Sequence, residues 1–149
     1  MNTSREWAEM TEKMFVGQKQ HAVRAKFNEM AEEFSIVNVE LSLKLAKRYR
    51  CKIKECYNNC AKIAMADDRY QYVEGYAMSI IVVEHAWLVN ENGEIVDPTW
   101  IRLDHGISND YFGVRVPIDK LELNGFSPGW LKYVLEKLEV ENGKRAAVS

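Results

Sequence analysis

The chain has 149 residues, a length that predicts a single domain. Hydrophobic residues make up 47% of it and charged residues 28%, shares that are typical of a globular protein and argue against a disordered one. Because 20 Lys and Arg stand against 22 Asp and Glu, the formal net charge is -2. We therefore expect no nucleic-acid binding and no recruitment to a membrane surface.

The sequence predicts neither a signal peptide nor a membrane span. The first 15 residues contain Glu6, Glu9 and Glu12, which interrupt the apolar segment that a signal peptide needs. The longest apolar runs, Ile80 to Val83 and Ala86 to Val89, are far shorter than the ~20 residues that cross a bilayer. The odd number of cysteines, three, fits a reducing compartment. We expect a cytoplasmic protein.

The first third of the chain is expected to be helical. Trp7, Met10 and Met14 recur at helical spacing, and Thr3 or Ser4 is a suitable N-cap. A second stripe with helical spacing is expected to pack in the core: Val23, Phe27, Met30 and Phe34.

The segment from Val37 to Arg48 fits two structures. Apolar residues alternate there as in a strand, but Leu41, Leu45 and the following Ala46 suit a helix, which we choose. A short Ala-rich helix is expected from Cys56 to Met65, with three small residues on one face: Cys56, Cys60 and Ala64.

Beyond Asp67 the pattern changes to strands, expected over 70–78, 80–90, 94–97 and 111–116. The apolar start of the strand 80–90 predicts a buried position, and Asn92-Gly93 predicts the hairpin turn that follows it. The segment 101–110 is expected to be a loop.

A last helix is expected to begin at Ser127-Pro128, with serine as the cap and proline as the first helical residue. Residues 144–149 are expected to form a frayed tail. The order of elements predicts an α+β fold with an antiparallel sheet. We expect one domain over 1–149, with a helical part over about 1–50 and a catalytic-like core over about 51–140.

Three residues have the chemistry of a thiol enzyme: Cys56 at the start of a helix, His85 in a strand and Asp97 in the next strand. A helix N-terminus favours a thiolate through its partial positive charge. An imidazole acts as base and then as acid, and a carboxylate holds that imidazole in the required tautomer. These positions predict a catalytic triad with Cys56 as nucleophile.

The hairpin between His85 and Asp97 decides whether the triad is possible. With a two-residue loop, Leu88 pairs with Asp97, and His85 then lies on the opposite face of the sheet. With a three-residue loop that has Gly93 in the left-handed conformation, Trp87 pairs with Asp97. His85 and Asp97 are then diagonal neighbours, ~7–8 Å apart at the backbone. The triad requires the second arrangement, and the sequence permits both.

Four short segments resemble the transglutaminase-like branch of the papain-like cysteine enzymes: Cys56-Tyr-Asn-Asn-Cys-Ala, Tyr72-Val-Glu-Gly-Tyr-Ala, His85-Ala-Trp-Leu and Ile95-Val-Asp-Pro-Thr-Trp. They occur in the order found in that superfamily and cover less than a third of the chain. The resemblance implies a cysteine-bearing helix packed on an antiparallel sheet. It also implies that Cys56, His85 and Asp97 are the nucleophile, the base and the orienting acid.

The sequence departs from that superfamily in two ways. It is much shorter than a true transglutaminase, and it lacks the glutamine that papain-like enzymes place shortly before the cysteine. The segment 50–55 contains no Gln, while Gln18 and Gln20 are remote in sequence. The backbone N–H of Cys56 is one expected oxyanion donor, and the second donor is not assigned.

Other assignments compete with this triad. Cys60 lies one helical turn after Cys56 and is expected to pack deeper in the core, and Cys51 is a weaker rival. His105 lies in the expected loop, and His21 is expected to be solvated. A zinc site of Cys56, Cys60 and His85 lacks a paired Cys-x-x-Cys motif. We expect no metal and no cofactor.

Four further residues are candidates for lining a substrate groove: Glu74, Trp87, Trp100 and Tyr111. Aromatic residues of a small sheet more often belong to the core, and Glu74 more often belongs to a solvated strand face.

The leading functional prediction is a cysteine-dependent hydrolase or acyltransferase. A cysteine protease, an amidase or a transglutaminase-like enzyme would each cleave an amide bond through a thioester, and the substrate would be a protein, a peptide or a small amide. The alternative is a non-catalytic binding module that retains the transglutaminase-like fold. A third possibility is that the helical part, Trp7 to Tyr49, docks a partner. The sequence does not give the oligomeric state.

Overall fold

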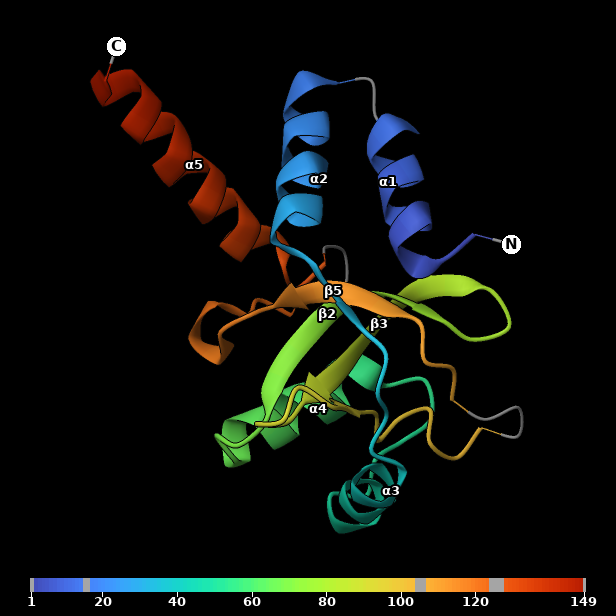
Figure 1. Ribbon diagram of the computed structural model, residues 1–149. Coiled ribbons are helices and arrows are strands. Elements are labelled where there is room, and N and C mark those ends of the chain that lie inside the picture. The colour runs from blue at the N-terminus through green and yellow to red at the C-terminus, as the bar shows by residue number, and fades with distance from the viewer. Residues whose placement is uncertain (1, 15–16, 104–106, 124–127, 149) are drawn as a thin grey trace.

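The structure is a computed structural model that describes residues 2–14, 17–103, 107–123 and 128–148. Within these ranges the fold is α+β, with five α-helices and one antiparallel five-stranded sheet of order β1-β5-β2-β3-β4. Figure 1 shows α1, α2 and α5 gathered at one end of the molecule and α3 and α4 at the other. The α+β prediction is confirmed.

The N-terminal helices are α1 (Ser4–Met14) and α2 (Gln18–Met30). Thr3 caps α1, since its Oγ1 accepts a hydrogen bond from the N–H of Glu6 at 3.1 Å. The stripe expected after Val23 is only partly helical. Val23 and Phe27 are buried on α2, but the helix ends at Met30, and Phe34 belongs to strand β1 (Glu32–Phe34) beside β5.

Helix α3 (Val39–Arg48) confirms the choice of helix for that segment. Asn38 caps it by accepting a hydrogen bond from the N–H of Leu41 at 2.9 Å. The residues just before the helix pair with β4: the N–H of Asn38 donates to the carbonyl of Ile95 at 2.9 Å. This pairing places the first turn of α3 beside the end of β4.

Helix α4 (Cys56–Ala66) leads into β2 (Gln71–Met78) and β3 (Val82–Val89), which pair along their whole length. The expected burial at the start of the strand 80–90 is wrong, because Ile80 and Ile81 form the exposed connection between the two strands. Strand β4 (Ile95–Val96) is shorter than expected, and β5 (Tyr111–Arg115) pairs with β1 and β2.

The C-terminal part contains the 3-10 helix η1 (Ile118–Lys120), which the sequence analysis missed, and α5 (Leu131–Val148). Pro128 precedes this helix by three residues, so its expected place as the first helical residue is wrong; Ser127 lies outside the described residues. The tail expected over 144–149 is helical from residue 144 to Val148, where α5 ends, and Ser149 lies outside the described residues.

Side chains of the two sheet faces pack in separate clusters. One face packs on the helices and includes Tyr72, Tyr76, Ala86 and Leu88 together with Cys56 and Cys60. The opposite face carries a mainly aromatic and β-branched cluster: Phe34, Val73, Ala77, Trp87, Val89, Ile95 and Tyr111. No helix within the described residues has the length and apolar character needed to cross a membrane.

Candidate active site

The hairpin between β3 and β4 has the register that the triad requires. Leu88 pairs with Val96, so Trp87 lies opposite Asp97. The N–H of Asn90 donates to the carbonyl of Glu94 at 3.1 Å, which closes a loop of residues 91–93. Gly93 has a φ of +77°, the left-handed conformation that glycine adopts at no steric cost. The three-residue loop is therefore confirmed, and His85 shares a face with Asp97.

His85 and Asp97 form a buried pair. His85 Nε2 lies 2.8 Å from Asp97 Oδ2, and the two residues are 2% and 0% exposed. The contact expected between these residues is confirmed. Burial alone lowers the pKa of His85, but the Asp97 carboxylate and a hydrogen bond with Cys56 outweigh it and raise that pKa to about 9. The imidazole is therefore protonated at neutral pH.

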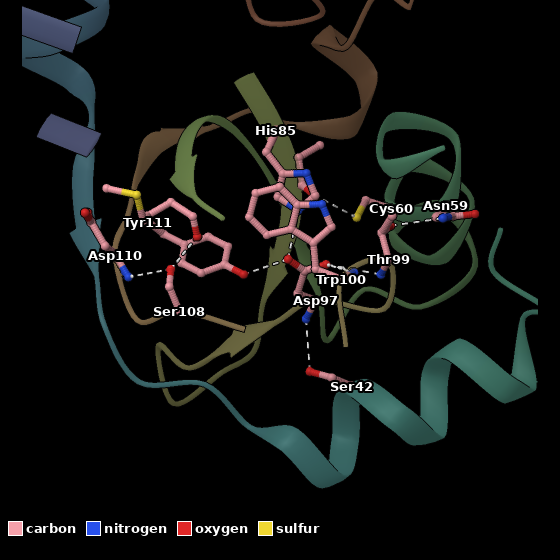
Figure 2. A network of polar contacts seen from close by, with 12 residues as sticks. Ser42, Asn59, Cys60, His85, Asp97, Thr99, Trp100, Ser108, Asp110 and Tyr111 are labelled. Carbon is pink, nitrogen blue, oxygen red and sulfur yellow. Dashed lines mark hydrogen bonds and ion pairs between the residues drawn. The ribbon is translucent and has the colours of Figure 1, made fainter. Parts of the chain in front are cut away.

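Four donors surround the Asp97 carboxylate (Figure 2). Besides His85, the Tyr111 hydroxyl donates to Oδ2 at 2.7 Å, and the N–H groups of Thr99 and Trp100 donate to Oδ1 at 3.1 and 2.9 Å. Burial acts to raise the pKa of Asp97, yet the charge of His85 and these bonds hold it below its ordinary value. Asp97 is thus a fixed anion behind His85.

Cys56 is the first residue of α4, and its thiol is one of the groups that raise the pKa of His85. Since Asp97 engages Nε2, Nδ1 is the ring nitrogen that remains for an interaction with the thiol. Glu55 occupies the N-cap, and its side chain makes no capping bond. The Glu55 side chain therefore does not cap the free N–H groups at this end of the helix, where Cys56 is the first residue.

The three cysteines differ in their surroundings. Cys56 is 8% exposed and Cys60 0%, which confirms that Cys60 is the more buried. The Cys60 thiol lies 3.6 Å from the carbonyl oxygen of Ala86, and burial raises its pKa well above the ordinary value. Burial also raises the pKa of the half-buried Cys51. Both thiols are in environments that suppress their reactivity.

Of the four residues considered for substrate binding, Trp100 is the one with appreciable exposure. Trp87 and Tyr111 are buried in the cluster behind His85, with ring centroids 4.9 Å apart, so they support the site rather than line a groove. Trp100 stacks directly on His85, with centroids 3.6 Å apart. The indole, which is itself partly exposed, therefore covers one face of the imidazole.

Glu74 is also buried, at 2% exposure, and neither expected position, a groove or a solvated strand face, fits it. It accepts hydrogen bonds from the Tyr72 hydroxyl at 2.7 Å and from the N–H of Gly129 at 2.9 Å. Burial raises the pKa of this carboxyl to about 7, and these bonds only partly oppose the shift. Glu74 therefore joins the sheet to the segment that enters α5.

Three polar residues around the pair were missed in the sequence: Ser42, Asn59 and Thr99. Ser42 Oγ accepts a hydrogen bond from the N–H of Asp97 at 3.0 Å. Asn59 Nδ2 donates to Thr99 Oγ1 at 3.0 Å. Asn59 lies three residues after Cys56 and Thr99 two after Asp97, so a polar residue one helical turn from the cysteine was the available signal.

The rival residues do not join this arrangement. His21, Gln18 and Gln20 are exposed on α2, and His105 lies outside the described residues. Among the residues that the structure describes, no group of three or more His, Cys, Asp or Glu side chains has the arrangement of a metal site. No protein-family model, curated protein or solved structure matches the chain.

Proposed function

We propose that the protein is a cysteine-dependent hydrolase or acyltransferase that cleaves an amide or peptide bond, as papain-like and transglutaminase-like enzymes do. The observation that carries the proposal is the buried His85–Asp97 contact of 2.8 Å, together with a cysteine at a helix N-terminus that is one of the groups raising the pKa of this histidine. A purely structural histidine needs neither a charged partner of this kind nor a thiol that acts on its protonation.

The reaction begins when the Cys56 thiolate attacks the carbonyl carbon of the substrate. The carbonyl oxygen becomes an oxyanion, which the backbone N–H of Cys56 stabilises as one donor. The C–N bond then breaks, and the amine leaves with a proton from His85. A thioester remains on Cys56, and His85 is neutral.

In the second half, neutral His85 takes a proton from water or from an acceptor amine as that group attacks the thioester. The C–S bond breaks, a carboxylic acid or a new amide is released, and the thiolate–imidazolium pair returns. Asp97 stays ionised throughout and holds the imidazole in place. The choice between hydrolysis and transfer depends on which acceptor reaches the thioester.

Iodoacetamide alkylation tests the chemical basis of this proposal. Native protein is labelled at pH 7, and peptide mapping separates the three cysteines. We expect Cys56 to react fastest and His85→Ala to slow it, while Cys60→Ala, the matched control one turn away, leaves its rate unchanged. An active ester such as p-nitrophenyl acetate should release nitrophenolate and leave acetyl on Cys56. A Cys56 rate no greater than that of the unfolded chain, and insensitive to His85→Ala, would overturn the proposal.

The low exposure of the site favours one second candidate, a binding module that keeps the fold without catalysis. Cys56 is 8% exposed and His85 2%, so a substrate has little direct access to either side chain in this conformation. The two candidates differ in the ester experiment. A binding module leaves Cys56 unacetylated even where iodoacetamide, a much smaller reagent than a peptide, reaches the sulfur.

A further inference from the structure

Asn59 is a buried amide on the helix of Cys56, and it bonds to two separate segments of the site. Its side chain is 3% exposed. The amide pairs with the backbone of Lys52 in both directions: Nδ2 donates to the carbonyl at 2.8 Å, and Oδ1 accepts from the N–H at 3.2 Å. The third bond joins Nδ2 to Thr99 Oγ1 at 3.0 Å. The amide is therefore a junction between three parts of the chain.

The first of these segments leads into Cys56. Two residues other than glycine have positive φ there, Arg50 at 51° and Lys54 at 68°. Such residues are rare and persist where neighbouring structure holds them. The two-way pairing between Asn59 and Lys52 lies between these strained positions. It fixes the turn from which α4 starts, and with it the position of the Cys56 backbone.

The second segment is the turn after β4. Thr99 receives the bond from Asn59 at its hydroxyl and donates its own N–H to Asp97 Oδ1 at 3.1 Å. Asp97 binds His85, and Cys56 is one of the groups that raise the pKa of His85. The path from Asn59 through Thr99, Asp97 and His85 thus returns to α4 at Cys56, three residues from where it began. Figure 2 shows most of this circuit, from Asn59 to His85.

We propose that Asn59 is a positioning residue, which sets the distance between Cys56 and His85 through the Asn59–Thr99 hydrogen bond. The inference rests on the proposed function. Without this bond, the helix that carries the thiol is joined to the strand of His85 and the turn of Asp97 by apolar packing and by the weak contact of the Cys60 thiol with the Ala86 carbonyl. Apolar packing is not directional, whereas a buried hydrogen bond fixes both distance and angle. The bond therefore holds the thiol and the imidazole in register before a substrate arrives.

The test removes the acceptor of this bond without touching the three reacting residues. Thr99→Val keeps the shape of the side chain and the N–H that binds Asp97, but it removes one of the two acceptors of Asn59 Nδ2 and leaves the bond to the Lys52 carbonyl. Thr99→Ser keeps the hydroxyl and is the rescue variant. Each is made in the wild-type chain and in His85→Ala. The readouts are the iodoacetamide rate of Cys56 at pH 7, the pKa of His85 by NMR and the free energy of unfolding in urea.

We expect Thr99→Val to slow Cys56 roughly fivefold, the rate equivalent of one lost hydrogen bond, and to lower the pKa of His85. Thr99→Ser should restore both. In the His85→Ala background the two Thr99 variants should react at the same rate, because the effect passes through the imidazole. A merely structural bond would change the free energy of unfolding alone. Where the valine variant does not fold, Thr99→Ala removes the same acceptor and leaves space for water.

The outcomes separate this inference from the proposed function. A rate that depends on His85 but not on Thr99 overturns the positioning role and leaves the enzyme proposal standing. A Thr99→Val effect of equal size in the His85→Ala background also overturns it, since the bond would then act on α4 alone. A Cys56 rate equal to that of unfolded chain, whatever residue 85 is, removes the proposed function and the inference together.

Discussion

The indole of Trp100 lies flat on the imidazole of His85, with ring centroids 3.6 Å apart and planes inclined by 13°. Trp100 is only partly buried, whereas His85 and its partner Asp97 have almost no exposed surface. The indole therefore shields one face of the imidazole from water. Exclusion of water strengthens the attraction between the two charges, and the face of the indole favours a cation beside it.

Trp100→Ala should lower the pKa of His85 from about 9 toward its ordinary value of 6.5. Water admitted to the pair weakens the attraction that holds the proton, and the favourable contact with the indole is lost. The measurement is an NMR titration of the imidazole, together with the iodoacetamide rate of Cys56. In Trp100→Phe, which keeps an aromatic face, the pKa of His85 should lie between the values of the wild-type protein and of Trp100→Ala. An unchanged titration in Trp100→Ala would mean that the indole only fills space.

Asp97→Asn should lower the pKa of His85 further than Trp100→Ala does. Burial by itself lowers the pKa of His85, and Asp97 is the main group that reverses this. Without the carboxylate the pKa should fall below 6.5, so the imidazole is neutral at pH 7 and Cys56 reacts slowly. Asparagine retains an oxygen for the N–H groups of Thr99 and Trp100, and the turn should therefore keep its shape. A pKa that stays near 9 would show that another anion stabilises protonated His85.

The hairpin shows how much of the site was predictable from sequence. The order of Cys56, His85 and Asp97 and the loop chemistry of Asn92-Gly93 narrowed the register to two alternatives. The three-residue loop is stabilised by Asn90. Its side-chain oxygen accepts hydrogen bonds from the N–H groups of Asn92 and Glu94 at 3.1 and 2.9 Å. These bonds favour the wider loop, and sequence spacing alone does not reveal them.

The remaining features depend on tertiary contacts between distant segments. Ile80 and Ile81 form an apolar run typical of a buried strand, but the connection between β2 and β3 leaves them exposed. Phe34 continues the helical stripe of α2 in sequence, yet pairing with β5 draws it into a strand. Ser42 has no signature of its own, because its partner Asp97 lies 55 residues further along the chain. The signal for Asn59 is its place one helical turn after Cys56, but its partner Thr99 lies 40 residues further on and the sequence does not show their pairing.

Gly75 has a steric role that the sequence analysis did not recognise. It pairs with His85 on one side and with Gly113 on the other. A Cβ on Gly75 would lie 2.3 Å from the carbonyl oxygen of Phe112 and 2.5 Å from the Cα of Gly113. These are backbone atoms, so the strands themselves would have to separate. Separation of β2 from β5 would also disturb the position of His85, which pairs with Gly75 on the neighbouring strand β3.

Gly75→Ala should therefore destabilise the fold by about 3 kcal/mol or more, in the range of a severely overpacked core site. Gly143→Ala on α5 is the matched control, because a Cβ there has no atom within 4 Å. Alanine in an exposed helix should stabilise the protein by about 0.5–1 kcal/mol. Urea denaturation of both variants measures the two effects. Equal stabilities would show that β2 and β5 tolerate a wider separation than this packing implies.

Glu74→Gln should change how the stability of the fold depends on pH. The pKa of Glu74 is raised from 4.5 to about 7 in the folded protein, chiefly by burial. A raised pKa means that the folded state binds the proton more tightly than the unfolded one. The contribution of protonated Glu74 to the free energy of unfolding is therefore fully present below pH 4.5 and is lost as the pH rises through 7. At about 1.4 kcal/mol per pKa unit, the wild-type protein loses on the order of 3 kcal/mol over this interval.

Glutamine remains neutral at every pH and keeps an oxygen for the N–H of Gly129, so the variant should not lose this stability. His85, whose pKa is raised from 6.5 to about 9, also reduces stability as the pH rises, but at higher pH and equally in both proteins. The difference between the two proteins therefore isolates Glu74. It should be small at pH 4.5, grow through pH 6 and reach its maximum near pH 8, as measured by urea denaturation across this range. A difference that does not change with pH would mean that Glu74 has the same protonation behaviour in the folded and unfolded chain, and that its bonds to Tyr72 and Gly129 offset the whole cost of burying its charge.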